Sequence, residues 1–407
     1  HEATYKSENA PKYHARETAE ELARLHNASV ILGSATPSLE AYYRAKKGEY
    51  QLFSLKERLT GGTLPKVDIV DLREELRQGN RSVFSRTLQE KIQDRLEKKE
   101  QIILFLNRRG YAGFVSCRAC GYVVKCPHCD VSMAEHKGSK MVCHYCGYET
   151  PAVHICPSCK SKYIQGFKAG TEQIEAEVHK RFPKARVLRM DADTTKTKES
   201  YETILSTFAE GNADILLGTQ MIVKGHDFPN VTLVGILAAD LSLHAGDYRA
   251  SERTFQLLTQ AVGRAGRGEK EGEAIIQTYR PEHYSVTYAA NQDYEGFYQE
   301  EMVYRELMDY PPVAHFMAVQ VLARELQNGE KLIQTLCERA KKYSKKVIGP
   351  TTASIGKIKD IYRLVFYVKE KEYSKLTQIK DDLETYIEGQ SLKNEAVYFD
   401  FDPMNTF

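Results

Sequence analysis

The stretch Gln101-Ile102-Ile103-Leu104-Phe105-Leu106 predicts a buried β-strand, because it is continuously apolar after its first residue. The preceding residues 85–99 predict an amphipathic helix. The same alternation continues along the chain, with strands expected at 29–33, 186–190, 214–218, 231–238 and 273–278 and helices at 15–26, 170–182, 200–210 and 252–263. Alternation of this kind predicts an α/β domain built on a parallel sheet, whose ligands meet the carboxyl ends of the strands.

Length and composition place the chain among ordinary globular proteins. Its 407 residues predict roughly two to four domains. Apolar residues make up 42% and charged residues 28%, which excludes a largely disordered chain. No apolar run approaches the ~20 residues of a membrane span, and we expect no membrane partner. Because the chain begins His1-Glu2-Ala3-Thr4, with neither an initiator Met nor a leader, we expect a piece of a longer cytoplasmic protein.

The charge of the chain is informative only in its distribution. Fifty-seven basic residues against 55 acidic ones give a net charge of +2, which by itself predicts no nucleic-acid partner. Residues 105–170, however, contain nine basic residues against three acidic ones. The same segment holds eight of the nine cysteines.

These eight cysteines form four Cys-x-x-Cys pairs, namely Cys117/Cys120, Cys126/Cys129, Cys143/Cys146 and Cys156/Cys159. A two-residue gap suits two thiolates on one tetrahedral ion, so the spacing predicts two Cys₄ zinc sites. Disulfides are the alternative, and the lack of a secretory leader disfavours them. Cys337 stands apart and is expected in a core.

The spacing leaves open which pairs share an ion, since neighbouring, interleaved and nested arrangements are all possible. A short hairpin of 131–133 with 140–142 would join the second and third pairs as a zinc ribbon, and the outer pairs would then share the other ion. A basic module held by metal suits phosphates or a partner protein. The alternative is that the zinc ions only support folding.

Three further motifs follow predicted strands or lie on a predicted helix. The first, Gly33-Ser34-Ala35-Thr36-Pro37-Ser38, offers hydroxyl groups in a loop of small residues. The second runs from Leu217 to Asp227, and its Thr, Lys, Gly and Asp could meet phosphates and a hydrolytic water, although a plain turn is the alternative.

The third motif, Gln260-Ala261-Val262-Gly263-Arg264-Ala265-Gly266-Arg267, places Gln260 and Arg264 on one helical face. Arginines there could neutralise charge on a transferring phosphoryl group, although exposed arginines often only face solvent. The three motifs in this order favour nucleotide hydrolysis on an α/β sheet.

These motifs resemble motifs III, V and VI of superfamily 2 helicases. The eight-cysteine insert narrows the resemblance to the PriA family of replication-restart helicases. Further phrases that carry the resemblance are Asn107-Arg108-Arg109-Gly110-Tyr111, Ala239-Asp240, Asp247-Tyr248-Arg249-Ala250-Ser251-Glu252-Arg253, Tyr310-Pro311-Pro312 and Asp402-Pro403-Met404-Asn405.

The resemblance implies a 3′-to-5′ DNA helicase that acts at abandoned replication forks, hydrolyses ATP with Mg²⁺ between two RecA-like lobes and initiates primosome assembly. It implies a nucleoid-associated bacterial monomer, with forked and single-stranded DNA, primosome loader proteins and single-stranded-DNA-binding protein as partners. It also implies nested cysteine pairing, with Cys117, Cys120, Cys156 and Cys159 on one Zn²⁺ and Cys126, Cys129, Cys143 and Cys146 on the other.

The resemblance further implies an ATP site of which this chain supplies only one part. Arg267 is expected as the arginine finger, with Arg264 as a second phosphate contact. The remaining expected residues are Gln260, His1 as the last residue of motif II, and the nucleotide-binding Gly225, Asp227 and Thr36. The Walker A loop and most of motif II would lie upstream, so we expect the chain alone to be inactive. The alternative function is a zinc-dependent DNA- or protein-binding platform; a zinc-ribbon nuclease is disfavoured, because no carboxylate cluster for two metals is evident.

The family carries an aromatic-rich loop between motifs II and III, and here Tyr5, Lys6, Tyr13, His14 and Arg16 occupy it. Tyrosines interleaved with basic residues suit single-stranded DNA without sequence preference. Packing of Tyr13 under the following helix is the alternative. Further DNA contacts are expected from Thr219 and Lys224.

The last part of the chain predicts a different fold, with strands at 315–321, 346–348, 361–368 and 397–402 and helices at 325–343 and 372–387. This β-α-β-β-α-β order predicts an α+β ferredoxin-like domain. The expected domains are the end of helicase lobe 1 (1–75), the RecA-like lobe 2 (76–115 and 164–290), the two-zinc insert (116–163) and the ferredoxin-like domain (291–407).

Overall fold

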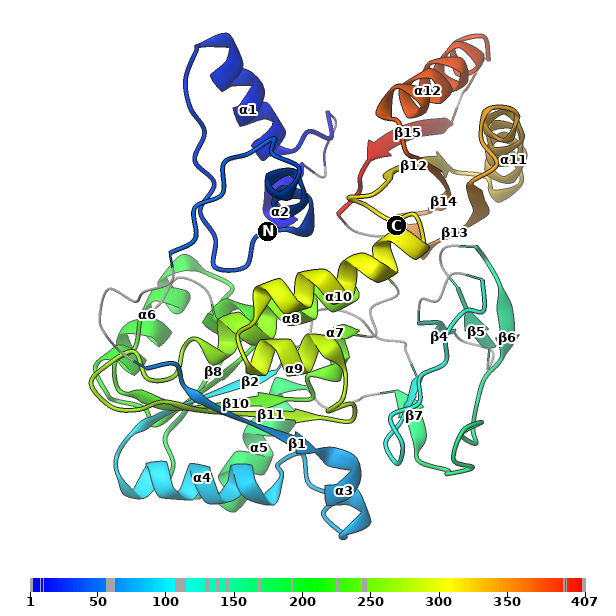
Figure 1. The fold of residues 1–407 in the computed structure, drawn as a ribbon. Helices are drawn as coiled ribbons and strands as arrows, with labels where there is room; N and C mark the ends of the chain where they lie inside the picture. Colours follow the sequence, from blue (N-terminus) through cyan, green and yellow to red (C-terminus); the bar gives the residue numbers. More distant parts are fainter. Residues whose placement is uncertain are drawn as a thin grey trace.

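The computed structural model describes residues 3–7, 9, 11–55, 63–106, 115–128, 132–136, 140–143, 146–166, 170–191, 193–223, 227–243, 247–390, 392 and 394–404. Figure 1 shows a large sheet with helices on both faces, a small Cys-rich insert at its side, and a second α/β unit above the insert. None of the helices in the described ranges is both long and apolar enough to cross a bilayer.

A six-stranded sheet forms the centre of the larger unit, in the order β1-β11-β10-β2-β9-β8. Every neighbouring pair in it is parallel. The strands are β1 (Lys66–Asp71), β2 (Gln101–Leu106), β8 (Val187–Met190), β9 (Ile215–Gly218), β10 (Val231–Leu237) and β11 (Glu273–Thr278). The parallel α/β fold predicted from the alternating pattern is therefore confirmed.

Two hydrophobic cores lie on opposite faces of this sheet, and β2 contributes to both. Its side chains alternate, with Ile103 and Phe105 in one core and Ile102 and Leu104 in the other. The helices that surround the sheet are α3 (Leu72–Arg77), α4 (Arg86–Glu97), α5 (Thr171–Arg181), α6 (Lys198–Ala209), η2 (Gln220–Val223), α7 (Asp240–Leu243), α8 (Ala250–Val262), α9 (Tyr284–Ala290) and α10 (Tyr294–Leu307). Figure 1 shows α4 and α5 below the sheet and α8, α9 and α10 above it.

The C-terminal unit is an antiparallel sheet in the order β13-β14-β12-β15, as expected for a ferredoxin-like domain. Its elements are β12 (His315–Ala323), α11 (Leu326–Tyr343), β13 (Val347–Ile358), β14 (Ile361–Glu370), α12 (Tyr373–Glu388) and β15 (Glu395–Phe401). One face packs on α11 and α12 through residues such as Val319, Leu336 and Leu376. β13 is much longer than the predicted strand at 346–348, because it continues through two irregularities in its pairing with β14.

The Cys-rich insert lies in the connection between β2 and α5. Strands β3 (Val115–Cys117) and β7 (Ile164–Gly166) pair at its base, and β4 (Ala134–His136), β5 (Lys140–Val142) and β6 (Glu149–Pro151) form a small sheet. The predicted first hairpin strand at 131–133 is wrong. Met133 and Ser132 instead contact Val124 and Lys125, so the strand that pairs with β5 starts at Ala134.

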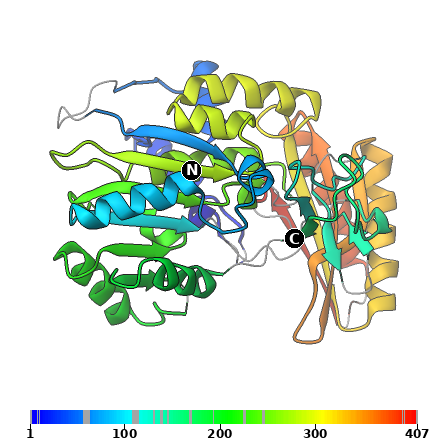
Figure 2. The ribbon, with the colours of Figure 1, turned by 90° about the horizontal axis from the view of Figure 1, so that it is seen from below.

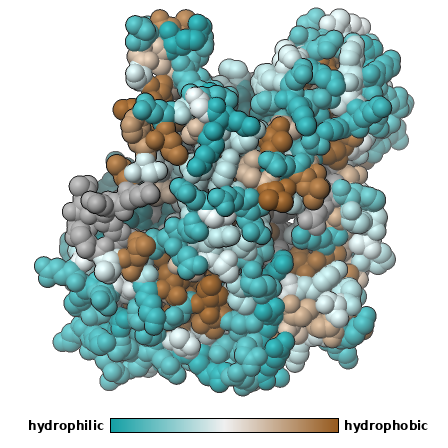
Figure 3. Space-filling model, viewed as in Figure 1, coloured by the Kyte–Doolittle hydropathy of each residue, from teal (hydrophilic) through white to brown (hydrophobic). Residues whose placement is uncertain are grey.

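The N-terminal segment contains η1 (Ala3–Tyr5), α1 (Ala15–Leu25) and α2 (Leu39–Lys46). The predicted strand at 29–33 is wrong, since this stretch forms no strand among the described residues and Ile31 is 93% exposed. An isolated strand is unstable without a pairing neighbour. Figure 3 shows apolar side chains gathered on the surface of this segment, at the upper left. The boundary expected after residue 75 stays a prediction, although β1, which precedes it, pairs with β11 in the large sheet.

Candidate metal centres and phosphate-binding residues

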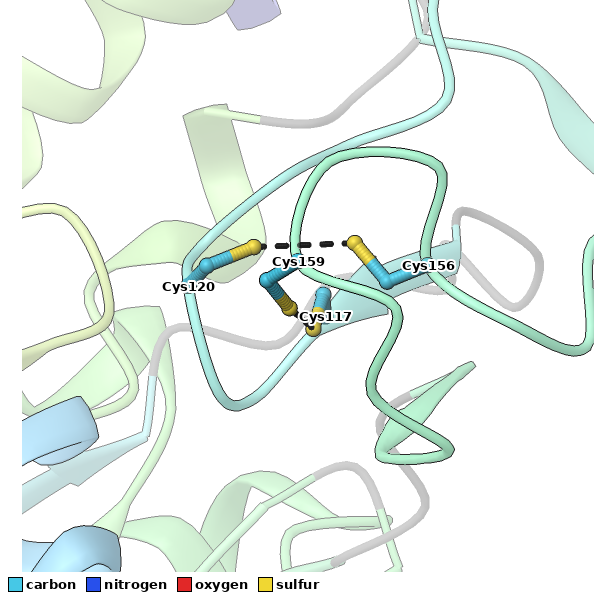
Figure 4. Close-up of side chains that lie close together, drawn as sticks. All are labelled: Cys117, Cys120, Cys156 and Cys159. Carbon is cyan, nitrogen blue, oxygen red and sulfur yellow. Dashed lines mark hydrogen bonds between the residues drawn. The ribbon is translucent and has the colours of Figure 1, made fainter.

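The first cysteine cluster joins the two ends of the insert. The Sγ atoms of Cys117 and Cys159 lie 3.6 Å apart, and those of Cys120 and Cys156 also lie 3.6 Å apart. All four sulfurs lie within 4.8 Å of one another (Figure 4). Zinc–sulfur bonds of about 2.3 Å in a tetrahedron require sulfur separations of about 3.8 Å, so the four thiols fit a Zn²⁺ ion.

The second cluster lies farther along the insert and contains Cys126, Cys143 and Cys146. The Sγ atoms of Cys126 and Cys146 are 3.6 Å apart. Cys129, the fourth expected ligand, lies outside the described residues. The structure thus groups the described cysteines in the nested manner that the resemblance implies.

A shared turn aims the sulfurs of each described knuckle in one direction. The backbone N–H of Gly121 donates to the Cys117 carbonyl at 2.8 Å, and Gly147 and Lys160 repeat this bond to the carbonyls of Cys143 and Cys156 at 2.9 Å. All three donor residues have positive φ, at 76°, 77° and 61°. Glycine adopts this conformation at no steric cost, which explains two of the three residues at this position.

Within the first cluster, the surroundings of Cys117 and Cys159 shift the pKa values of their thiols in opposite directions. Burial raises the pKa of Cys117 to about 12, whereas a hydrogen bond from the Ser161 backbone N–H lowers the pKa of Cys159 to about 7. A bound cation would supply the positive charge that stabilises four thiolates at neutral pH. The cluster therefore has the donor set, the spacing and the chemistry of a structural zinc site.

The insert packs against both large units (Figure 2). On the lobe side, Arg118 donates to the Tyr279 hydroxyl at 2.9 Å. A Cβ atom on Gly121 would lie only 2.5 Å from the Tyr279 carbonyl oxygen, so a side chain there would separate the surfaces. On the other side, residues such as Met141 share a hydrophobic core with Phe316 and Tyr367 of the C-terminal sheet.

Two of the expected phosphate-binding motifs meet after α8. The Arg267 guanidinium lies 3.8 Å from the carboxylate of Asp227. Burial and the neighbouring Arg267 lower the pKa of Arg264 to about 10. The expectation that Gln260 and Arg264 share one helical face is wrong, because Gly263 caps α8 after Val262: Gln260 lies in the last turn of the helix and Arg264 in the turn that follows it. Arg264 is partly buried and Arg267 is exposed. Two neighbouring arginines of this kind suit an anion with several negative charges, such as a polyphosphate.

The motif around Thr36 is placed differently. Thr36 is 1% exposed, and the Leu39 N–H nearby donates to Glu252 in the first turn of α8 at 3.0 Å. The Tyr294 hydroxyl of α10 donates to the Pro37 carbonyl at 3.0 Å. From Glu252 to Val262, the last residue of α8, the helix rises roughly 15 Å, at 1.5 Å per residue. Thr36 therefore lies near the first turn of α8, whereas Arg264 follows the last turn.

A buried ionic network surrounds the first turn of α8, and the sequence analysis missed it. Arg305 of α10 lies 2.7 Å from Glu301 and 3.1 Å from Glu252, with all three side chains nearly or fully buried. Arg249 pairs with Glu40 of α2 in the same region. The four-residue spacing of Glu301 and Arg305 was a sequence signal for a pair, but not for its burial.

Among the residues expected to contact DNA, the two tyrosines are exposed, whereas His14 and Arg16 make hydrogen bonds within the protein. Tyr5 and Tyr13 expose 54% and 53% of their surface. His14 accepts a hydrogen bond from the Arg16 N–H as the N-cap of α1, and burial together with Arg16 lowers its pKa to about 4. The Arg16 guanidinium donates to the Ser38 hydroxyl at 3.0 Å.

Thr219 directly follows β9, at the carboxyl end of the parallel sheet, and its carbonyl accepts the N–H of Ile222 at 3.1 Å. Four other expected site residues lie outside the described part of the chain: His1, Cys129, Lys224 and Gly225.

The fold and these sites define a RecA-like lobe of the helicase class with a Cys-rich insert and an added C-terminal domain. Three family models match the chain: the PriA DNA helicase Cys-rich region (CRR) domain at 126–151, the helicase conserved C-terminal domain at 156–269 and the primosomal protein N C-terminal domain at 306–404. The chain belongs to the PriA family.

Relatives named replication restart protein PriA match almost the entire chain. The protein of Bacillus subtilis (strain 168) is 50% identical over 408 residues, covering 99% of this chain and 51% of the relative. That of Synechocystis sp. is 42% identical, covering 92% of this chain and 47% of the relative. The chain therefore spans about half the length of these curated relatives. Among solved structures, S. cerevisiae Dbp5 bound to RNA and ADP BeF3 aligns with a TM-score of 0.33 and 12% identity, covering 72% of this chain and 59% of that one.

Proposed function

We propose that the chain is the C-terminal half of an ATP-dependent 3′-to-5′ DNA helicase that recognises abandoned replication forks and initiates primosome assembly. The observation that carries this proposal is the pair Arg264 and Arg267 beside Asp227, directly after a helix that packs on a parallel α/β sheet. The 50% identity to a replication restart protein PriA supports the biological setting.

In this proposal Arg267 acts as the arginine finger and Arg264 as a second contact to the transferring phosphoryl group. Charge on the γ-phosphate develops in the transition state, and two fixed guanidinium groups would stabilise it without reorganisation. Asp227 lies beside Arg267 and would keep its side chain oriented until the nucleotide binds. The Mg²⁺-binding and Walker A groups would come from the other half of the longer protein.

The two cysteine clusters are proposed as structural zinc sites. When bound, zinc supplies a fixed tetrahedral crosslink between segments that are otherwise connected only by short strands. Cys117 and Cys120 would be tied to Cys156 and Cys159, and this link would hold the insert against Tyr279 of the lobe. Such a module could then present its basic side chains to DNA phosphates or to a loader protein.

The first test is DNA-stimulated ATP hydrolysis on a forked substrate, measured for this chain and for a version extended to the length of its relatives. We expect hydrolysis only from the extended version, and only with DNA. If neither version hydrolyses ATP although both are folded and contain zinc, the helicase proposal is wrong.

A second candidate function is a zinc-dependent binding platform without ATPase activity. The position of the insert favours it, because the insert contacts both the lobe and the C-terminal sheet. Removal of zinc with a chelator should then abolish binding of primosome proteins while binding of DNA persists. Loss of both together would instead indicate general unfolding.

A further inference from the structure

The expected aromatic loop is closed into a compact turn at its base. Lys6 and His14 form an isolated antiparallel bridge, and the Ser7 N–H donates to the Tyr13 carbonyl at 2.9 Å. Tyr5 and Tyr13 flank this base and are about half exposed. The bridge therefore joins the two backbone segments that carry these tyrosines, and both rings are accessible at the surface.

One carboxylate of the C-terminal domain holds this turn in place. Asp400, near the end of β15, lies 3.0 Å from the Lys6 ammonium and 3.3 Å from the Lys12 ammonium. Lys6 also donates to the Phe401 carbonyl at 2.6 Å. The side chains of Lys6, Lys12 and Asp400 are only 10%, 13% and 8% exposed. Because solvent screens such shielded pairs less than surface pairs, this contact is stronger than an ordinary surface ion pair.

The residues that follow Asp400 reach the helix that precedes the phosphate-binding arginines. Arg253 of α8 donates to the Met404 carbonyl and lies 2.7 Å from the Asp247 carboxylate. Asp402 accepts the Phe316 N–H at 2.8 Å, which fixes this tail to β12. Figure 1 shows the end of β15 directed toward the N-terminal segment. A continuous series of contacts thus joins the turn, the end of β15 and α8.

We propose that Asp400 is a positioning residue for nucleic-acid binding: it clamps Lys6 and Lys12 so that Tyr5 and Tyr13 are preorganised to stack on bases of single-stranded DNA. This inference rests on the proposed function. Without the clamp, the turn must be ordered when DNA binds, and the conformational entropy lost in that ordering weakens binding. The lysines act by holding the turn, which replaces the earlier expectation that Lys6 contacts a phosphate.

The test uses the protein extended to the length of its relatives, with oligo(dT) as the probe. The measured quantity is the oligo(dT) concentration that gives half-maximal stimulation of ATP hydrolysis. We expect Asp400→Asn to raise it about tenfold, which corresponds to a loss of about 1.4 kcal/mol of binding free energy. The control is Asp382→Asn, which removes a carboxylate 2.8 Å from Arg339 on the outer helices of the same domain and should change nothing.

A double-mutant cycle separates positioning from general damage. The combined variant Lys6→Gln and Lys12→Gln should reproduce the effect of Asp400→Asn, and all three substitutions together should add nothing further. Additive effects would overturn the inference, because they would mean that the lysines contact DNA independently of Asp400.

An unchanged half-saturation in Asp400→Asn, with normal stimulation of the unmodified protein, would overturn the inference alone. If the unmodified protein shows no DNA stimulation at all, the proposed function itself is wrong and the inference falls with it.

Discussion

At the scale of single residues, the functional groups are defined more by their neighbours than by their type. Arg264 and Arg305 have the same side chain, yet Arg305 is buried between two glutamates and Arg264 lies beside another arginine. Partners of opposite charge make Arg305 a structural residue. Arg264 has a like-charged neighbour in Arg267, and an anion bound between the two would relieve their repulsion.

Substitution of Arg267 by Ala in the extended protein should reduce ATP turnover by roughly 10³-fold or more, the usual contribution of an arginine finger. A matched control is Arg77→Ala, since Arg77 is an exposed residue of α3 that pairs with Glu74. Steady-state hydrolysis with saturating DNA measures both variants. Unchanged turnover in Arg267→Ala would refute the assignment.

His315 should titrate above its ordinary range, because its hydrogen bond to Asp402 raises the pKa of the imidazole. A raised pKa stabilises the fold below the ordinary value near 6.5, and this contribution is lost as the pH rises through the folded-state pKa. NMR titration of the ring should show the shift. The pKa should return toward its ordinary value in Asp402→Asn, and a pKa unaffected by that change would contradict the assignment.

At the scale of elements, the sequence predicted well the helices and strands that have a clear hydrophobic pattern of their own. It predicted poorly the segments whose structure depends on a neighbouring strand. β2 and α4 were predictable, because strand and helix each follow their own periodicity and Ser85 caps α4 by accepting the Leu88 N–H. The stretch 29–33 has strand composition, but a strand also needs a pairing neighbour, which composition does not encode. β1 was missed because it is a half-buried edge strand without a continuous apolar run.

For the candidate sites too, local features could be predicted from the sequence and contacts between distant residues could not. Cysteine spacing predicted that the thiols cluster, and the described cysteines do so, because the spacing within a Cys-x-x-Cys knuckle is a local property. The ion pairs of Asp400 join residues almost four hundred positions apart, and no local pattern encodes such a contact.

Replacement of Cys156 by Ser should lower the zinc content from about two ions to about one per chain, because a tetrahedral structural site needs all four ligands. Metal analysis of the purified chain measures this. Cys337→Ser is the matched control, since Cys337 is a buried core cysteine on α11, outside both clusters. Equal zinc content in both variants would contradict the site.

At the scale of the whole molecule, one junction connects the N-terminal segment, the lobe and the C-terminal domain. Arg305 pairs with Glu252 of α8 and donates to the Pro311 carbonyl at 2.6 Å, at the entrance to the C-terminal domain. Tyr248 stacks on Tyr310 with ring centroids 4.6 Å apart in the same region. The domains are therefore joined through a polar, buried contact in addition to the chain itself.

Arg305→Met should destabilise the fold by about 3–5 kcal/mol, because it leaves buried carboxylates without a counter-charge. Burial already raises the pKa of Glu301, and the loss of Arg305 would favour its protonation further. The control Arg339→Met removes a partly exposed ion pair and should change the stability far less. Urea denaturation compares the two. A midpoint for Arg305→Met no lower than that of the control would show that the network is dispensable.

The pairing of β3 with β7 has a consequence for how this architecture could have been assembled. The chain leaves the lobe and returns to it through two adjacent strands, so the two covalent connections of the insert lie side by side. A module attached in this way can be removed and replaced by a short turn without changing the path from β2 to α5. The lobe would keep its own two cores after such a removal. Phe316 and Tyr367 of the C-terminal sheet, however, would lose the apolar residues of the insert that cover them.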